Sequence, residues 1–294
     1  MPAHATRETP ASVSVVIPTF NGAHHLDEQL AALAGQDYPE PFDVVLADNG
    51  STDATLEIAR RWAGRVKLTV TDASAQHTIG YATNMGVRAT RSQLIAFTDQ
   101  DDVVPSQWLT ALVRGAREAD LTGGPSATGA INSRRTLRSR PTQRASTGPE
   151  VFAGFLPTLW TNSLAVWRDV YDDLGGFSDE YATGSDVDLC WRAQLAGYRL
   201  GFAPEASVQY RLRSTTSGVM TQRFNYGRSN VQLFRDFHPH GMPRQLWRGA
   251  GSWILMVVRI PYLLLPGWRS RWLGDLALRL GRLRGSIEYH CFYP

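Results

Sequence analysis

The chain has 294 residues, 43% of them hydrophobic and 19% charged, and a formal net charge of +3. This composition is ordinary for one large globular domain, or for one domain with an appendage. It argues against a disordered, fibrous or disulfide-framework protein.

Strand and helix patterns alternate through the first third of the chain. Short β-branched or apolar segments that end at polar residues predict buried strands, and the stretches between them have helical apolar spacing. The strands are expected at residues 13–18, 42–48, 66–72 and 93–99, and the helices at 21–36, 49–64 and 80–90. Asn21 is placed to cap the first helix and Ser51 or Thr52 the second, while Gly35 can end the first. This alternation predicts a parallel sheet covered by helices.

The second half of the chain is less regular. We expect a helix at 105–120, strands at 121–131 and 161–168, a helix that begins at 185 and ends near Gly197, and helices from 214 to the end. Residues 133–149 carry five arginines and no acidic residue. This segment is expected to be a mobile flap that orders on a phosphate-bearing ligand, and the alternative is a solvated loop.

Polar and acidic residues stand where the predicted strands end. They are Pro18, Thr19, Asn21, Asp48, Asn49, Asp72, Asp99, Asp101 and Asp102. Ligands of doubly wound sheets bind beyond the carboxyl ends of the strands, so these residues should line one site. The chain lacks a G-x-G-x-x-G motif and a Walker lysine loop, which argues against a dehydrogenase or a P-loop enzyme.

Three carboxylates occupy four positions in "DQDD", residues 99–102. Oxygen ligands suit a hard divalent cation, Mg²⁺ or Mn²⁺, which in proteins commonly bridges carboxylates to phosphates. This arrangement predicts a nucleotide-diphosphate site. The alternative is a solvated turn without a ligand.

Four segments, taken in order, resemble the family 2 glycosyltransferases, which have the GT-A fold. They are "VSVVIPTFNGAHHLDEQLAAL", "DVVLADNGSTDAT", "ATNMGVRATRSQLIAFTDQDD" and "LGGFSDEYATGSDVDLCWRAQLAGY", and they cover most of residues 13–213. The resemblance implies an α/β, Rossmann-like fold with a mostly parallel central sheet flanked by helices. It divides the chain into a catalytic domain at 1–213 and a basic helical extension at 214–294. The nucleotide-sugar half is expected at about 13–102 and the acceptor half at about 103–213.

The resemblance also implies an activity. The chain would be an inverting glycosyltransferase that moves a sugar, of the hexosyl kind, from a nucleotide-diphosphate sugar to an acceptor hydroxyl. The expected setting is cell-envelope glycan, glycolipid or natural-product glycosylation.

Individual roles follow from the resemblance, position by position. The nucleotide-sugar would be held by Pro18, Thr19, Asn21, Asp48, Asn49, Asn84 and Asp99. Asp101 matches the metal ligand, and Gln209 stands where the family often has a metal-binding histidine. Asp186 matches the catalytic base, although a helix cap would also explain an acid there. The candidate acceptor or diphosphate contacts are Asp102, Ser185, Arg211, Arg213, Arg223 and Tyr226.

The basic tail suggests a second task. From Arg211 onward there are 13 arginines and three acidic residues, a net charge of +10. Trp272, Leu273, Leu276, Leu280 and Leu283 form an apolar stripe among arginines, and residues 253–265 are also apolar. This pattern suits a surface that lies on anionic lipid beside a lipid-linked acceptor. The alternative is a tail that packs on the catalytic domain or on a second copy in a homodimer.

No basic segment followed by an apolar one opens the chain, and Cys190 and Cys291 form no framework. We therefore expect a cytoplasmic protein, with attachment to the inner face of the membrane as an option. One rival hypothesis is a catalytically inactive GT-A scaffold that binds a membrane or nucleic acid. The acidic face opposes nucleic acid, and none is expected. A nucleotidyltransferase is a second rival, but the glycine- and lysine-bearing loop is missing.

Overall fold

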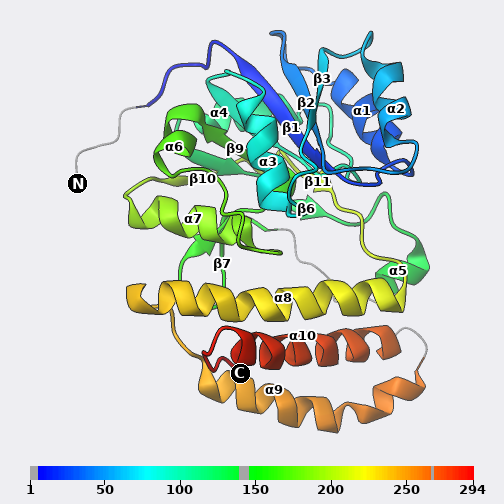
Figure 1. Ribbon diagram of the computed structural model, residues 1–294, viewed down its shortest axis with the longest axis vertical. Helices are drawn as coiled ribbons and strands as arrows, with labels where there is room; N and C mark the ends of the chain where they lie inside the picture. Colours follow the sequence, from blue (N-terminus) through cyan, green and yellow to red (C-terminus); the bar gives the residue numbers. More distant parts are fainter. Residues whose placement is uncertain (1–5, 139–145, 266–267) are drawn as a thin grey trace.

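A seven-stranded sheet forms the centre of the computed structural model, which describes residues 6–138, 146–265 and 268–294 (Figure 1). The strand order is β10-β5-β9-β4-β1-β2-β3. The strands are β1 Val13–Thr19, β2 Asp43–Asp48, β3 Leu68–Asp72, β4 Leu94–Phe97, β5 Leu121–Gly123, β9 Leu164–Trp167 and β10 Leu200–Phe202. All neighbours pair in parallel except β9, which runs antiparallel to β4 and β5. The predicted mostly parallel sheet is confirmed.

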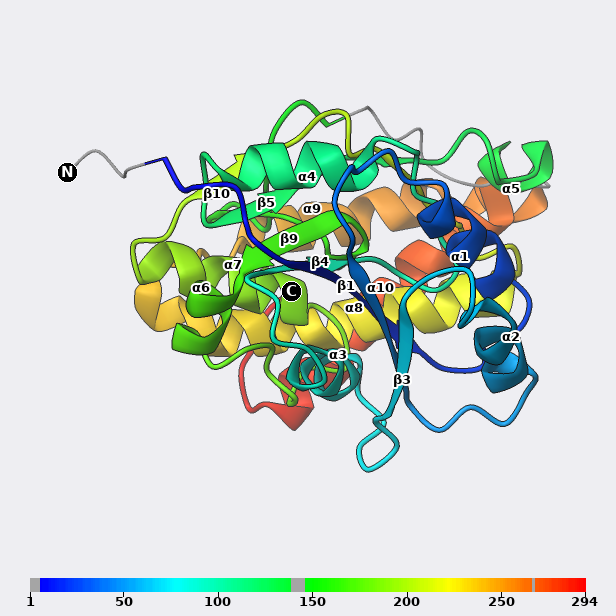
Figure 2. The ribbon, with the colours of Figure 1, turned by 90° about the horizontal axis from the view of Figure 1, so that it is seen from above.

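The central strands β1, β2 and β4 are largely apolar because helices cover both faces of the sheet. Figure 2 shows α4 Trp108–Ala116 on one face and α3 Ile79–Arg88 on the other. Val15, Val16 and Ile17 of β1 have no exposed surface, as expected for a strand buried on both faces. Gly86 lets α3 approach closely, since a Cβ there would lie 2.5 Å from Val16.

The remaining elements of the first 210 residues are short. Two small two-stranded sheets pair β6 Ser126–Ala127 with β11 Val208–Gln209, and β7 Glu150–Val151 with β8 Pro157–Thr158. The helices are α1 Leu26–Ala34, α2 Thr55–Trp62, α5 Arg134–Arg138, α6 Arg168–Asp173, α7 Ser185–Leu195 and the 3₁₀ turn η1 Thr161–Ser163. Part of the arginine-rich segment therefore forms α5, and residues 139–145 of the predicted flap lie outside the described residues.

The predicted N-caps of α1 and α2 were wrong, whereas Gly35 is the C-cap of α1 as predicted. His25 precedes α1 and Ala54 precedes α2, and neither makes a side-chain cap. Asn21 has a positive φ of 49° and instead uses its Oδ1 to accept a hydrogen bond from the Thr52 amide at 2.8 Å. The loop after β1 is thus tied to the loop after β2, which fixes both at the carboxyl edge of the sheet.

Three helices make up the C-terminal extension. They are α8 Thr216–Phe237, α9 Leu246–Val258 and α10 Trp268–Glu288, joined by the 3₁₀ turns η2 His238–His240 and η3 Ile260–Leu264. The helix α8 lies beneath the catalytic part, α10 packs along α8, and α9 forms the outermost layer (Figure 1). No helix in the described part of the chain has the length and apolar character needed to cross a membrane.

The contact between α8 and α10 is unusually close. A Cβ on Gly281 would lie 2.0 Å from the carbonyl oxygen of Phe224, and one on Gly227 would lie 2.0 Å from that of Leu278. The buried line along α10 is Gly274, Ala277, Gly281 and Gly285. Small residues, and not the predicted Leu/Trp stripe, are therefore the packed face of α10.

Candidate active site

A pocket opens at the carboxyl edge of the sheet, where β1 and β4 end. It is lined by Pro18 after β1, by Thr98 and Asp99 after β4, by Ile79 and Thr83 of α3, and by Thr161 and Ser185. The last two residues belong to the predicted acceptor half. The fold therefore brings residues from both predicted halves of the catalytic domain to one pocket.

The loops after β1 and β2 carry the residues that the sequence predicts to bind the nucleotide. Both carboxylate oxygens of Asp48 accept from the Ser51 amide, at 3.3 and 3.2 Å, and Thr19 is almost fully buried. The Asn49 amide nitrogen donates to the Thr78 carbonyl at 3.3 Å, but its Oδ1 is buried and has no partner among the described residues. This orphaned acceptor could receive an N–H donor from a ligand.

Asn84 is engaged on all sides. Its Nδ2 donates to the Phe177 carbonyl and to Asp179, both at 2.8 Å, and its Oδ1 accepts from the Phe177 amide and the Tyr171 hydroxyl. No hydrogen-bonding capacity is left for a nucleotide. Direct nucleotide binding by Asn84 stays a prediction, and these contacts favour a role in positioning the 174–181 loop.

The acidic turn after β4 is held by hydrogen bonds from distant segments. Asp102 is fully buried and accepts from Asn162 at 3.1 Å and from the Arg211 amide at 2.9 Å. Burial, reinforced by the charge of Asp101, raises the pKa of Asp102 to about 7. These contacts give Asp102 a structural task in the turn, in contrast to the predicted acceptor or diphosphate contact.

Like charges crowd around Asp99. Burial raises the pKa of Asp99 well above its ordinary value, and the carboxylates of Asp102, Asp101 and Asp186 raise it further. A cation would relieve this repulsion, so the electrostatics favour binding of a positively charged group.

Two arginines reach the turn from the segment after β11. Arg213 forms an ion pair with Asp101 at 3.0 Å, while Arg211 donates to the Asp101 carbonyl at 2.7 Å and pairs with Glu28. Gln209 pairs through its backbone with Val103, and its side-chain oxygen accepts from the Ala130 amide at 3.2 Å. The predicted cluster of Gln209, Arg211 and Arg213 therefore does lie beside the acidic turn.

Asp186 occupies the first turn of α7, after Gly184 with φ of 84°. Its Oδ1 accepts from the Val187 amide at 2.9 Å, so it contributes to the helix start as the alternative interpretation proposed. Burial raises the pKa of Asp186 to about 6. Ser185, its neighbour on α7, lines the same pocket as Asp99, and the charge of Asp186 adds to the burial that raises the pKa of Asp99.

Tyr226 on α8 shares a hydrogen-bonding partner with Tyr210, whereas Arg223 lies against α10. Burial and the charge of Asp186 raise the pKa of Tyr226, and Gln222 donates to the hydroxyls of both Tyr226 and Tyr210, at 3.1 and 3.2 Å. Arg223 instead lies against α10, close enough to Arg279 to lower the pKa of that guanidinium. This placement does not favour the predicted acceptor contact of Arg223.

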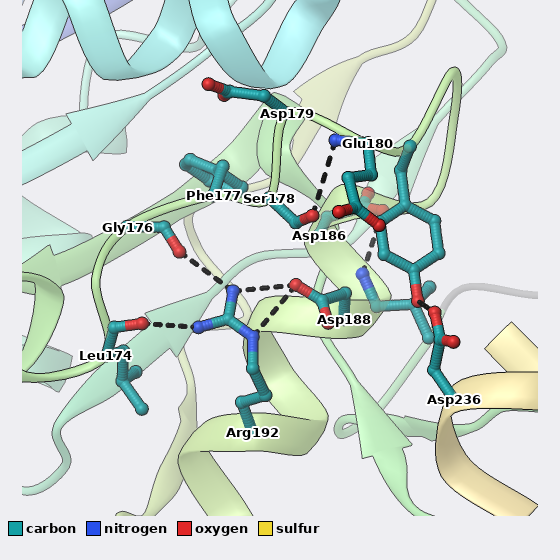
Figure 3. Close-up of polar contacts among 12 residues, drawn as sticks. Leu174, Gly176, Phe177, Ser178, Asp179, Glu180, Asp186, Asp188, Arg192 and Asp236 are labelled. Carbon is teal, nitrogen blue, oxygen red and sulfur yellow. Dashed lines mark hydrogen bonds and ion pairs between the residues drawn. The ribbon is translucent and has the colours of Figure 1, made fainter. Parts of the chain in front are cut away.

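The loop that precedes α7 is held by Arg192 of the same helix (Figure 3). Its guanidinium donates to the carbonyls of Leu174 at 2.6 Å and Gly176 at 2.8 Å, and pairs with Asp188 at 2.6 Å. Asp188 is buried in this contact and does not face solvent. Together with Asn84, Arg192 fixes the segment that leads into Asp186.

Comparison with known proteins decides the family. The model described as "Glycosyl transferase family 2" matches residues 14–173, and the one described as "Glycosyl transferase family group 2" matches residues 94–279. The chain belongs to glycosyl transferase family 2. It is a nucleotide-sugar-dependent glycosyltransferase with the GT-A fold, as predicted.

The relatives of this family 2 enzyme span different substrates. It is 28% identical to "Glycosyltransferase AglE" of Haloferax volcanii, over 76% of this chain and 74% of the relative. It is 26% identical to "Validoxylamine A glucosyltransferase" of Streptomyces hygroscopicus, over 93% of this chain and 67% of the relative. The fold is similar to that of the mannosyltransferase PcManGT from Pyrobaculum calidifontis, with a TM-score of 0.70, 20% identity and coverage of 97% and 89%.

That PcManGT structure is a complex with GDP-Man and Mn²⁺. In the family 2 enzyme described here, no group of three or more His, Cys, Asp or Glu side chains is arranged for a metal within the described ranges. The donor set around Asp101 still suits a cation that takes most of its ligands from a diphosphate, because its carboxylate neighbours crowd one another.

Several residues of the site could not be named from the sequence. Asn162 supports Asp102, Glu28 holds Arg211, and His25 lies near Asp101, whose charge raises the pKa of His25 while burial and Arg211 lower it overall. None lies in a segment whose pattern indicates such a contact, since each depends on the tertiary fold.

Proposed function

We propose that the enzyme catalyses an inverting transfer of a sugar from a nucleotide-diphosphate donor to an acceptor hydroxyl. The observation that carries the proposal is that Ser185, the residue before Asp186 on α7, lines the same pocket as Asp99 of the acidic turn. Inversion needs one base on the acceptor side and charge stabilisation on the leaving-group side. The two groups come from the acceptor half and the nucleotide half, and they adjoin one pocket.

Asp186 is proposed as the general base. A pKa of about 6 leaves the carboxylate ionised at neutral pH and more basic than an ordinary aspartate. A base whose pKa lies near the working pH accepts a proton most effectively in the transition state. As the acceptor oxygen attacks the anomeric carbon, its proton passes to Asp186, and the bond from that carbon to the diphosphate oxygen breaks.

The donor is proposed to bind along the edge formed by Pro18, Thr19, Asn21, Asp48 and Asn49. The orphaned Oδ1 of Asn49 would accept an N–H of the base, and the Asp48 loop would face the ribose. Asp99 would complete the contacts to the ribose or the sugar.

A divalent cation is proposed as the cofactor, with Asp101 as its main protein ligand and Gln209 as a weaker one. When bound, it would neutralise charge that builds on the departing diphosphate. Arg213, now paired with Asp101, would share that task by contacting the diphosphate. Domain limits at 1–213 and 214–294 belong to the same proposal.

The acceptor is proposed to carry its hydroxyl on a lipid-linked molecule at the inner, cytoplasmic face of a membrane. The basic extension supports this choice because its net charge of +10 favours an anionic surface. Ser185 and Tyr226, which lie on the acceptor side, would contact that substrate. A homodimer is the competing use of the same extension.

An inactive GT-A scaffold is disfavoured by one observation. The acidic turn and Asp186 both crowd into the centre with raised pKa values, which costs stability and is typical of working sites. A scaffold without activity has no use for this arrangement.

The test combines a donor panel with a matched pair of variants. UDP-, GDP- and TDP-sugars, each with and without Mn²⁺, are screened by thermal shift and by release of nucleoside diphosphate. Asp186→Asn should keep donor binding and lose transfer by about 10²–10⁴-fold, the usual range for a general base. Asp172→Asn, on the exposed surface of α6, serves as the control. Unchanged turnover in Asp186→Asn would reduce Asp186 to a helix cap.

A further inference from the structure

The outer face of α9 is apolar throughout. With 3.6 residues per turn, Leu246, Trp247, Ala250, Gly251, Ile254, Leu255, Val257 and Val258 fall on one half of the helix. All eight are exposed, Trp247 at 91% and Val258 at 68%. Among the α9 side chains that the structure describes, no polar one is exposed, so this helix turns its apolar half away from the protein. A helix surrounded by water normally does the reverse.

The inner half of α9 is anchored to the rest of the extension. The Trp272 indole donates to the Met256 carbonyl at 3.0 Å, and Arg279 donates to the Ser252 carbonyl at 2.9 Å. Gly249 packs against Pro294, since a Cβ on this glycine would lie 2.4 Å from the proline ring. The apolar half is therefore held outward by specific contacts on the opposite side.

The apolar surface continues beyond α9. In η3, Ile260 and Leu264 are exposed, Leu264 at 84%, and Leu265 and Trp268 follow at the start of α10. We call the exposed residues of α9, η3 and this start the outer apolar face. It lies in the layer farthest from the central sheet (Figure 1). Exposed apolar surface of this extent marks an interaction site.

The surrounding charge identifies the class of partner. Residues 237–274 contain five arginines and no acidic residue. Arg269 is exposed next to the face, and Arg271 stacks over the Trp268 ring at 5.4 Å. A purely apolar partner would not explain why the charged residues of this segment are all arginines. An anionic lipid surface takes both features at once, since apolar side chains enter the acyl region while arginines meet headgroups.

The stripe on α10 that the sequence suggested is not this surface. Arg279 and Arg282 point inward, where each donates to a backbone carbonyl, Ser252 and Pro294 respectively. Burial lowers the pKa of both guanidinium groups. The face that carries unpaired apolar surface belongs to α9 and η3.

We propose that the outer apolar face inserts into the interface of an anionic membrane, with α9 lying in the membrane plane. The helix has 13 residues, whereas a spanning helix needs about 20. This inference specifies the surface behind the lipid-linked acceptor of the proposed function. Vesicle binding does not depend on sugar transfer, so the membrane proposal and the proposed transfer reaction can each fail without the other.

The experiment is vesicle flotation of the full chain. Vesicles of phosphatidylglycerol and phosphatidylcholine are compared with phosphatidylcholine alone, at low and high salt. Wild type should float with the anionic vesicles, and salt should weaken binding because it screens the arginines.

Two variants remove apolar anchors, and a third is the matched control. Val258→Glu and Trp247→Ser should each weaken partitioning by about tenfold or more, since each removes an inserted side chain. Val70→Glu makes the same chemical change as Val258→Glu on β3, at an exposed position far from the face, and should bind as wild type does. Because Trp247 is almost fully exposed, Trp247→Ser should retain the wild-type melting temperature.

Three outcomes would overturn the proposal. Wild type that ignores anionic vesicles at low salt has no lipid-binding face. Equal loss in Val70→Glu would mean that general charge, and not the face, controls binding. A dimer by light scattering that both face variants dissociate, without vesicle binding by wild type, would assign the face to a second copy.

Discussion

Asp186→Asn should make the enzyme more stable while it destroys transfer. The pKa of Asp186 rises from its ordinary 3.8 to about 6 because of burial. A carboxyl with a raised folded-state pKa contributes stability that is fully present below the unfolded pKa and lost as pH rises through the folded one. Once ionised in both states, this carboxyl costs about 3 kcal/mol of folding free energy. Asparagine keeps the shape without the charge.

The pH dependence of the stability difference between the two proteins tests this reasoning, because a change in packing would alter stability equally at every pH. The stability gained by Asp186→Asn should be smaller at pH 5, grow to about 3 kcal/mol at pH 7, and then level off. Urea unfolding of both proteins without donor, at pH 5, 6, 7 and 8, measures the difference. The transfer rate of wild type should fall below a pKa of about 6 as the base becomes protonated. Equal stability at every pH would refute the reasoning, as would a gain that does not change with pH.

Other variants test the rest of the site and the extension. Asp101→Asn should abolish the Mn²⁺-dependent part of donor binding in thermal shift and keep the fold, and unchanged Mn²⁺ stimulation would contradict its role. Arg192→Lys should lose the hydrogen bonds that hold the 174–181 loop and lower stability by about 1–3 kcal/mol in urea unfolding. It should reduce kcat by a larger factor than it changes the donor KM, and equal factors in kcat and KM would argue against a positioning role. Gly281→Ala should cost about 2 kcal/mol in thermal unfolding because its Cβ meets the Phe224 carbonyl. The matched Gly251→Ala, which meets nothing within 4 Å, should be neutral or stabilising, and a similar loss in both would deny the close contact.

The parallel half of the fold could be predicted because its strands have a recognisable apolar pattern in the sequence. Strands buried on both faces need largely apolar runs, and β1, β2 and β4 have them. The antiparallel insertion of β9 between β4 and β5 was not predictable, since a four-residue strand carries no sign of its direction or neighbours. The N-caps of α1 and α2 were missed because Asn21 bonds across to the next loop, a choice made by the tertiary fold.

The acidic turn and Asp186 could be found from the sequence because short motifs carry them. Their supports could not. Asn162 lies 60 residues beyond Asp102, and Glu28 lies 183 residues before Arg211, yet both pairs are in direct contact. Such contacts form only when the chain folds, and they determine which carboxylates are already bonded to protein groups. The sequence alone assigned Asn84 to the nucleotide, whereas in the fold all the donors and acceptors of its side chain are hydrogen-bonded to protein groups.

The extension shows why an apolar pattern identifies a face without revealing its direction. Periodicity detected leucines on α10 and an apolar run at residues 253–265, and it assigned both to one lipid-facing surface. In the fold, a line of small residues packs α10 against α8, because glycines let the backbones approach and bury main-chain atoms. That packing leaves the bulky side chains of α9 without protein to cover them. Apolar residues that the protein does not cover need another partner. Residues 237–274, which include α9, contain five arginines and no acidic residue, so an anionic lipid surface is the chemically consistent partner.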